Sequence, residues 1–208
     1  MKAQKYLLVG LIPLTVLLSS CSGETKSDAE TEQEEKNIQL VENSLNVEWT
    51  AYKTTEKLPV KGVFNDVKLE TLLNKGENPE EILNDATFNI DVNKLTTGNA
   101  GRDMKIKTLF FGLMEESGNI SGKLCYSDRK WNVNLTMNGT SIKVPVAVNF
   151  EDNIFHMKSN IALANFNALR MLESLNKACY ELHKGADGIS KTWEEVDIDV
   201  TISFNEKA

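Results

Sequence analysis

The sequence predicts a mainly β domain of about eight antiparallel strands, arranged as a barrel or a sandwich, together with two helices. Three observations lead to this prediction. Apolar and polar residues alternate through most of the chain beyond residue 45, turn-forming residues separate the alternating runs, and only two stretches show helical spacing. A closed barrel is favoured because closure removes the exposed edges of a sheet.

Each predicted strand has one apolar and one polar face, which is the pattern of an antiparallel strand with one buried side. Turn signals at Ser127-Asp128, Asn138-Gly139 and Asp152-Asn153 indicate hairpins between neighbouring strands. The strands are expected over residues 45–51, 60–69, 86–93, 120–126, 131–137, 142–148, 155–161 and 196–204.

Two stretches show helical spacing instead. The first covers residues 100–113 and begins after Asn99, a residue type favoured as an N-terminal cap. The second covers residues 166–183 and ends before Lys184-Gly185. Its apolar residues fall on one side: Phe166, Leu169, Leu172, Leu175, Cys179 and Leu182. This late amphipathic helix is expected to lie across one end or side of the barrel.

The first 20 residues have the features of a secretory signal peptide. Lys2 and Lys5 precede an apolar run, residues 6–18, that is shorter than the roughly 20 residues a membrane-spanning helix needs. Leu18-Ser19-Ser20-Cys21 follows and resembles the bacterial lipobox, whose cysteine becomes the acylated mature N-terminus. We therefore expect an exported protein with a lipid on Cys21, anchored to a bacterial membrane on its periplasmic side or at the outer surface.

Residues 21–37 are expected to form the lipidated cysteine and a disordered tether. The segment is rich in glutamate, has no aromatic residue, and cannot bury enough apolar surface to offset the entropy of ordering. The remaining residues, 38–208, are long enough for a single domain with its own core.

The composition argues against nucleic acid as a partner. The net charge is -7, and arginine occurs only at positions 102, 129 and 170, without the basic clustering that phosphate binding requires. In the predicted domain, Cys125 and Cys179 are either bridged or two buried thiols, and the sequence leaves both open. It also leaves open whether the chain forms a homodimer.

Nothing in the sequence predicts catalysis. The two histidines, His156 and His183, have no identifiable partner, although a His183 cation at a helix end would interact favourably with the helix dipole. Asp197 and Asp199 are expected on the wet face of a strand. We find no motif for a nucleophile, a phosphate loop or a metal, and we predict no catalytic residue, metal or cofactor.

One passage resembles a known family. Residues 95–103, LTTGNAGRD, run into Leu109-Phe110-Phe111 and resemble the Thr-Gly-Asn turn, Arg-Asp pair and Phe-Phe ending of YceI-like proteins. Residues 60–66 and 138–146 resemble two further segments of that family, in the same order. The resemblance implies an eight-stranded antiparallel lipocalin-like barrel with a long apolar cavity, in which some members bind polyisoprenoid or other long-chain lipids.

The chain departs from the family pattern at two places. Gly112 stands where an aspartate commonly follows Phe-Phe, and the late helix replaces an Arg-containing turn before the last strand. That helix is able to cap, narrow or fill the cavity.

The inward-facing residues are the candidates for ligand binding, with Arg102 as a candidate at the cavity mouth. Those candidates are Trp49, Phe88, Ile90, Phe110, Phe111, Leu124, Trp131, Val133, Val146, Phe155 and Met157. The alternative is that these side chains fill a solid core, and that Arg102 only forms a local ion pair with Asp103.

Two hypotheses about function follow. The first is a membrane-anchored lipoprotein that binds a long apolar ligand, of isoprenoid, quinone or fatty-acid type, inside the barrel. The second is a non-enzymatic interaction protein of the cell envelope with a filled barrel and no ligand.

Overall fold

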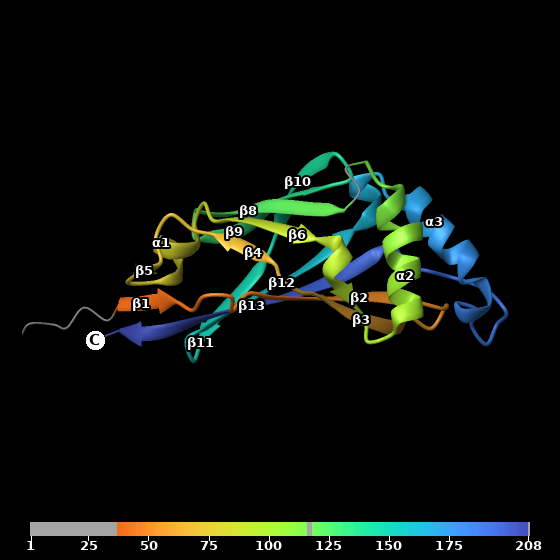
Figure 1. Ribbon diagram of the computed structural model, residues 1–208, viewed down its shortest axis with the longest axis horizontal. Coiled ribbons are helices and arrows are strands. Elements are labelled where there is room, and N and C mark those ends of the chain that lie inside the picture. Colours follow the sequence, from red (N-terminus) through yellow and green to blue (C-terminus); the bar gives the residue numbers. More distant parts are fainter. Residues whose placement is uncertain (1–36, 116–117, 208) are drawn as a thin grey trace, which may run out of the picture. The chain divides into compact units, whose positions relative to one another are not determined.

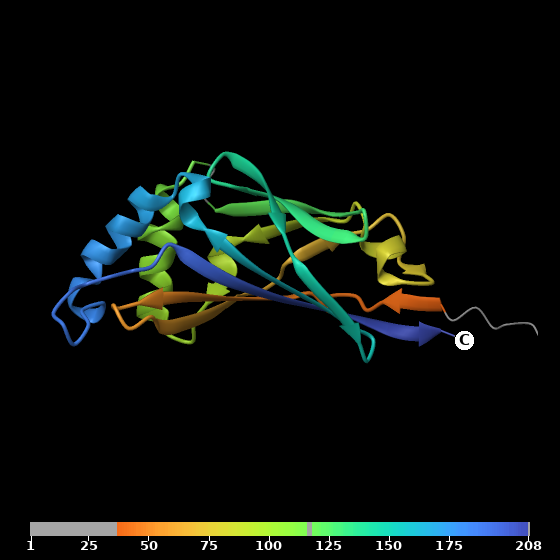
Figure 2. The ribbon, with the colours of Figure 1, turned by 180° about the vertical axis from the view of Figure 1, so that it is seen from behind.

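The computed structural model describes residues 37–115 and 118–207. The predicted signal peptide, Cys21 and almost all of the tether lie outside the described residues. The described part is mostly β, with few helices, and its strands form two antiparallel sheets (Figures 1 and 2). Within it, no helix is both long enough and apolar enough to cross a membrane.

The larger sheet has eight strands, in the order β11-β12-β13-β2-β3-β7, with β1 paired to β13 and β5 paired to β1. The long strand β13 organises it, because β12, β2 and β1 all pair with β13. The strands are β1 Asn37–Leu40, β2 Asn46–Lys53, β3 Leu58–Phe64, β5 Lys75–Gly76, β7 Leu95–Thr96, β11 Ala147–Glu151, β12 Ile154–Ala162 and β13 Glu195–Lys207.

The smaller sheet has five strands, in the order β10-β9-β8-β6-β4. These strands are β4 Lys68–Glu70, β6 Thr87–Asp91, β8 Asn119–Ser127, β9 Lys130–Met137 and β10 Thr140–Pro145. The two sheets pack face to face around one core. Trp131 of β9 and Phe155 of β12, for example, meet edge to face with their ring centroids 5.2 Å apart.

The closed barrel of eight strands is not observed. Among the described residues no strand pairing joins the two sheets, and thirteen strands are present. The predicted strand over residues 60–69 is broken at Asp66, whose φ is 56°, and there the chain leaves the larger sheet for the smaller one. It joins the larger sheet briefly at β5 and returns to it through the 3₁₀ turn η1, Val92–Lys94, between β6 and β7. It passes back to the smaller sheet at β8, and it crosses to the larger sheet again at Val146, between β10 and β11.

All three predicted hairpins are present, with two turns at the predicted residues and the first turn one residue later than the predicted Ser127-Asp128. Asp128-Arg129, Asn138-Gly139 and Asp152-Asn153 all have positive φ at both residues. Two consecutive residues with positive φ give the turn whose twist matches that of a two-residue hairpin. These turns fix the pairing of β8 with β9, β9 with β10 and β11 with β12.

The first predicted helix is confirmed as α2, Ala100–Leu109, followed by the 3₁₀ turn η2, Phe111–Leu113. The Asn99 side chain caps it by accepting a hydrogen bond from the backbone N–H of Arg102 at 2.9 Å. The second helix is shorter than predicted. It is α3, Leu169–Ala178, flanked by the 3₁₀ turns η3, Leu163–Phe166, and η4, Tyr180–Leu182. Asn167, with φ 56°, separates η3 from α3.

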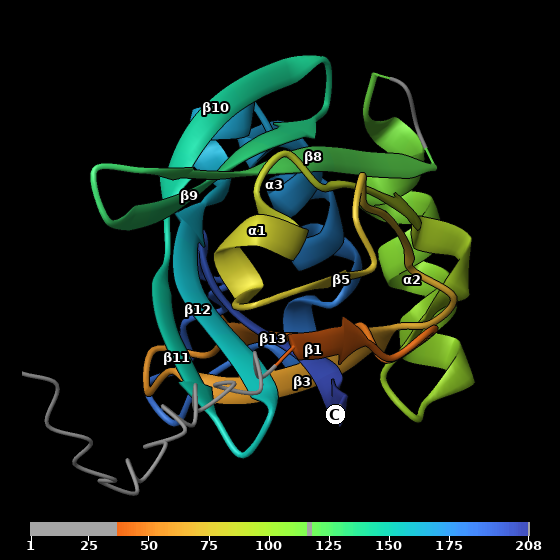
Figure 3. The same cartoon turned by 90° about the vertical axis from the view of Figure 1, so that its left-hand side faces the viewer.

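Helices lie at both ends of the sheets. Helices α2 and α3 pack together at one end, and α1, Pro79–Leu83, lies with β5 at the other (Figures 1 and 3). Ile82 and Leu83 of α1 are buried and belong to the core.

Cys125 and Cys179 are both free thiols. Of the two alternatives that the sequence left open, a disulfide bridge or two thiols, the structure therefore has the thiols.

Candidate ligand-binding cavity

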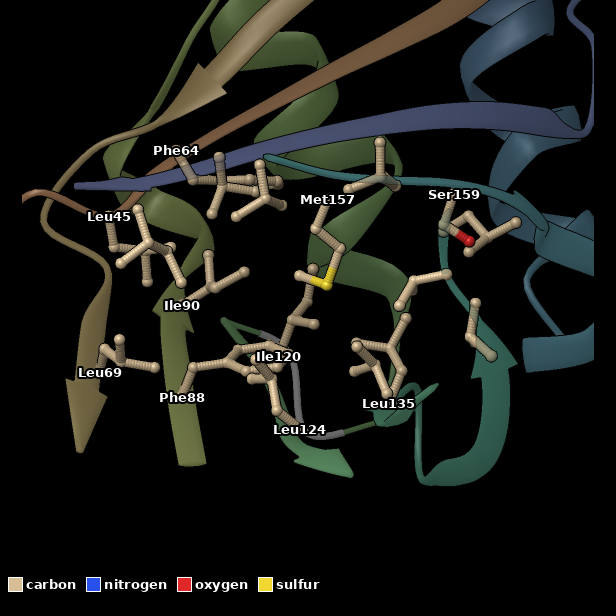
Figure 4. Close-up of a pocket in the computed structure, with 18 of the residues that line it drawn as sticks. Leu45, Phe64, Leu69, Phe88, Ile90, Ile120, Leu124, Leu135, Met157 and Ser159 are labelled. Atoms are coloured by element: carbon tan, nitrogen blue, oxygen red, sulfur yellow. The ribbon is translucent and has the colours of Figure 1, made fainter. Parts of the chain in front are cut away.

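A first cavity of about 100 Å³ lies between the two sheets. Figure 4 shows that Phe64 and Met157 of the larger sheet point toward the same interior as Phe88 and Leu135 of the smaller sheet. Ser159 is the one lining residue with a polar side chain, and its hydroxyl donates to the carbonyl of Pro145 at 3.0 Å. The cavity therefore offers a ligand apolar contacts.

A second cavity, of about 120 Å³, lies toward α2 and α3. Phe110, Ile106 of α2 and Leu175 of α3 are part of its wall. Five residues line both cavities, namely Phe64, Ile120, Met137, Ile161 and Ile198. The two cavities are therefore neighbours along the interior, and α3 covers one end without filling it.

The second cavity adjoins an open pocket of about 360 Å³, which we call the mouth. Five residues line both the second cavity and the mouth, namely Trp49, Ala51, Ile106, Leu175 and Thr192. The remaining residues of the mouth include four basic ones, Lys53, Arg102, Lys105 and His183. No residue that lines the mouth is acidic.

The basic residues come from three elements. Arg102 and Lys105 lie three residues apart on α2, so they share one face of that helix. Lys53 ends β2, and its ammonium group donates to the carbonyl of Leu182 at 3.1 Å. His183 follows η4 in the stretch between α3 and β13, residues 179–194, which we call the late segment.

The late segment is tied to the end of β2. The indole N–H of Trp193 donates to the carbonyl of Thr54 at 2.7 Å, and the backbone N–H of Trp193 donates to the carbonyl of Tyr52. The ammonium groups of Lys57 and Lys191 lie 4.1 and 3.4 Å from the centroid of the same indole. Cations stack favourably on aromatic rings, so these contacts also hold the late segment against the end of β2.

Asp103, next to Arg102 in the sequence, does not neutralise the mouth. Its carboxylate accepts hydrogen bonds from the backbone N–H of Thr97 at 2.8 Å, and from the hydroxyls of Thr97 and Thr96. Burial opposes ionisation of Asp103, but these hydrogen bonds outweigh it and hold its pKa below the ordinary value. The predicted ion pair between Arg102 and Asp103 is therefore not formed, because the Asp103 carboxylate is hydrogen-bonded to Thr96 and Thr97 instead.

His183 is half-buried in the wall of the mouth. Its Nδ1 atom lies 2.6 Å from the Thr192 hydroxyl and 3.2 Å from Oδ1 of Asn176. Burial, followed by the nearby charges of Lys53, Lys105 and Arg102, lowers its pKa to about 4. His183 is thus neutral at pH 7, and the helix-dipole interaction expected of a His183 cation is absent.

A scan against protein families matches residues 37–204 to the YceI-like domain. The chain belongs to the YceI-like family. Its fold matches a polyisoprenoid-binding domain from Saccharophagus degradans, with a TM-score of 0.58 and 11% identity over 82% of this chain and 98% of that one. It also matches BcnA of Burkholderia cenocepacia, with a TM-score of 0.51 and 16% identity over 78% and 98%. Comparison with curated protein sequences finds no match.

The candidate residues of this YceI-like domain fall into three groups. Phe88, Ile90, Leu124, Val133, Val146 and Met157 line the first cavity, while Trp49, Phe110 and Phe111 line the second. Arg102 lines the mouth, as does Trp49. Trp131 and Phe155 line neither cavity nor the mouth. Their rings pack against each other, and both residues line a separate open pocket together with polar residues such as Arg129 and Asn149.

Several lining residues were not among the candidates. Val47, Ile161 and Ile198 line a cavity, and the alternation of their strands already placed them on the inward face. No pattern in the sequence indicated Lys53, Lys105 or His183, because they come together only through the packing of β2, α2 and the late segment.

Gly112 stands where the family commonly has an aspartate. It fits a tight turn, since a Cβ there would lie 3.0 Å from the carbonyl oxygen of Lys107.

The described residues contain no group of three or more histidine, cysteine, aspartate or glutamate side chains able to hold a metal. The two carboxylates on the wet face of β13 are engaged elsewhere. Asp197 accepts from Tyr52 and Asn160, and Asp199 pairs with Lys158. The chemistry that the site offers is therefore apolar burial next to a basic surface.

Proposed function

We propose that this YceI-like protein binds an amphiphile, with the apolar part of the ligand in the two cavities between the sheets. The observation that carries the proposal is the first cavity, whose only polar side chain already has a hydrogen-bond partner. Moving apolar surface from water into such a space stabilises a complex by about 25 cal/mol per Å². The proposal is a binding function without a catalytic step.

The ligand we propose is of isoprenoid, quinone or fatty-acid type. The likeness to a polyisoprenoid-binding domain supports this class through the fold. The cavity size restricts the fit, because each cavity is smaller than the roughly 150 Å³ apolar cavity that binds benzene. Without movement the interior holds on the order of ten carbon atoms. A longer chain requires the sheets to separate or extends out through the mouth.

We also propose that the protein works beside a membrane, held there by lipid on Cys21. The lipobox-like sequence Leu18-Ser19-Ser20-Cys21 supports this proposal. A lipid-anchored binding domain stays next to the bilayer, where apolar ligands concentrate. Two or more acyl chains are needed for stable anchoring, as the lipobox resemblance implies.

Native mass spectrometry of the full-length protein, purified from its source organism, tests ligand binding directly. We expect an added mass that dissociates as a lipid. Val133→Phe, which places a ring in the first cavity, should lose that mass. Val148→Phe is the matched control, because Val148 lines neither cavity. A protein that carries no lipid and takes up no added prenyl lipid or fatty acid would support the alternative of an interaction protein without a ligand.

A further inference from the structure

The mouth is a local concentration of positive charge in an acidic protein. The chain has 30 acidic residues and 23 lysines and arginines, yet the cations Lys53, Arg102 and Lys105 line the mouth beside the neutral His183, without any acidic residue. A pocket of one sign of charge with apolar walls attracts ions of the opposite sign. The mouth therefore favours an anion.

The cations of the mouth are not used in ion pairs. Elsewhere in the described residues, Lys57, Lys94, Lys123, Lys158 and Lys184 each pair with a carboxylate. In the same part of the chain, Lys53, Arg102 and Lys105 form no ion pair, and Lys53 binds only the carbonyl of Leu182. The charged N–H groups of these three residues are therefore available to donate hydrogen bonds to an anion.

The three cations Lys53, Arg102 and Lys105 all lie near His183. Each lies close enough to the half-buried imidazole of His183 to disfavour its protonation. Like charges that converge without a counterion repel one another, and a bound anion relieves that repulsion. The elements that converge here are β2, α2 and the late segment.

A second observation, independent of charge, lies where the mouth meets the second cavity. Trp49 lines both, and the residue as a whole is 7% exposed. Its indole N–H is buried and has no acceptor. A buried donor without an acceptor is unfavourable and is rare in folded proteins, so it calls for a partner. An oxygen of a ligand headgroup near this junction is a suitable acceptor.

We propose that the mouth binds the negatively charged headgroup, a carboxylate or a phosphate, of a single-chain amphiphile whose chain extends into the second cavity. This inference rests on the proposed function and adds the class of ligand. Arg102 and Lys105 hold the anion from α2, Lys53 holds it from β2, and Trp49 donates to an oxygen at the junction. The uncharged analogue of the same chain leaves these donors without a partner.

The test compares three ligands with the same ten-carbon chain: decanoate, decyl phosphate and decan-1-ol. Isothermal titration calorimetry on the full chain, at concentrations below micelle formation, measures each affinity. We expect at least one of the anions to bind about tenfold more tightly than the alcohol, because hydrogen bonds to a charged acceptor are the stronger ones. The tighter of the two anions identifies the headgroup as carboxylate or phosphate.

The double variant Arg102→Gln/Lys105→Gln should bring the ratio of anion to alcohol affinity close to one. Lys107→Gln/Arg170→Gln is the matched control, because it removes two charges from α2 and α3 outside the mouth and should keep the ratio. A variant that merely unfolds weakens all ligands alike and leaves the ratio unchanged. Equal affinity of the native chain for anions and alcohol overturns the headgroup proposal alone. Failure of all three ligands to bind overturns the proposed function as well.

Discussion

The six-membered ring of the Trp49 indole lies over Gly62, the residue directly opposite it on β3. A Cβ atom at position 62 would lie 2.3 Å from Cζ2 of Trp49, well inside van der Waals contact. The smaller sheet repeats the arrangement, because a Cβ atom at Gly122 would lie 2.4 Å from Cζ of Phe88. In each sheet a glycine gives room to a ring that lines the interior.

Gly62→Ala should displace the Trp49 ring and destabilise the fold by about 1–3 kcal/mol, the usual cost of overpacking a core. Urea unfolding followed by circular dichroism measures the change. Gly101→Ala is the control, because its Cβ would lie 3.5 Å from the nearest atom outside its neighbours, and alanine is favoured over glycine within a helix. A Gly62→Ala protein as stable as the native one would show that Trp49 moves aside freely.

Asp103→Asn should destabilise the protein by about 1 kcal/mol, because the amide is a weaker acceptor for Thr97 and Thr96 than the partly exposed carboxylate. The pKa of Asp103 is lowered from 3.8, so its contribution is complete above about pH 5 and lost as the pH falls through the lowered value. The variant should lack this part of the acid dependence. Unfolding curves at pH 3 and pH 6 measure both effects, and equal differences at the two pH values would contradict the assignment.

His183→Gln should flatten the dependence of stability on pH between about 4 and 6.5. Because the pKa of His183 is lowered from 6.5 to about 4, the unfolded chain binds more protons in this range, and stability falls as the pH falls. After reduction for its half-exposed position, the effect is on the order of 2 kcal/mol. An NMR titration of the imidazole gives the pKa directly, and a midpoint near 6.5 would remove the basis for this prediction.

Cys21→Ala should abolish attachment of lipid and leave the signal peptide uncleaved, because acylation and cleavage of a lipobox depend on its cysteine. Metabolic labelling with an alkyne fatty acid measures the attached lipid, and the mass of the intact protein shows whether the signal peptide remains. Cys125→Ala and Cys179→Ala are controls that should keep the label. Labelled Cys21→Ala protein would place the lipid elsewhere.

Much of the local structure was predictable from the sequence. Alternation placed Val47, Trp49 and Val200 on inward faces, and all three are buried. The hairpin turns and the Asn99 cap followed from the preferences of single residues. The number of strands was not predictable in this way. Asp66 and Val146 mark places where the chain changes sheets, and nothing in the alternation around them indicates a crossing.

The site was predictable only in part, for a related reason. Inward positions such as Phe88 and Met157 were candidates because a strand fixes which face each residue occupies. Trp131 and Phe155 share that pattern, yet they fill the core, because ring packing across the sheets decides where space remains. The predicted ion pair between Arg102 and Asp103 is absent because Thr97 and Thr96 donate hydrogen bonds to the Asp103 carboxylate.

The sequence by itself determined the strands with their buried faces, the tight turns and the resemblance of residues 95–111 to the YceI-like family. These properties depend on residues that are close along the chain. Only the tertiary structure decided that the strands divide into two sheets, that a cavity remains between them, and that Lys53, Arg102, Lys105 and His183 meet at its mouth. Those outcomes depend on packing between segments that are far apart along the chain, such as Lys53 and His183, which are separated by 130 positions. Local patterns of apolarity and charge do not specify such distances.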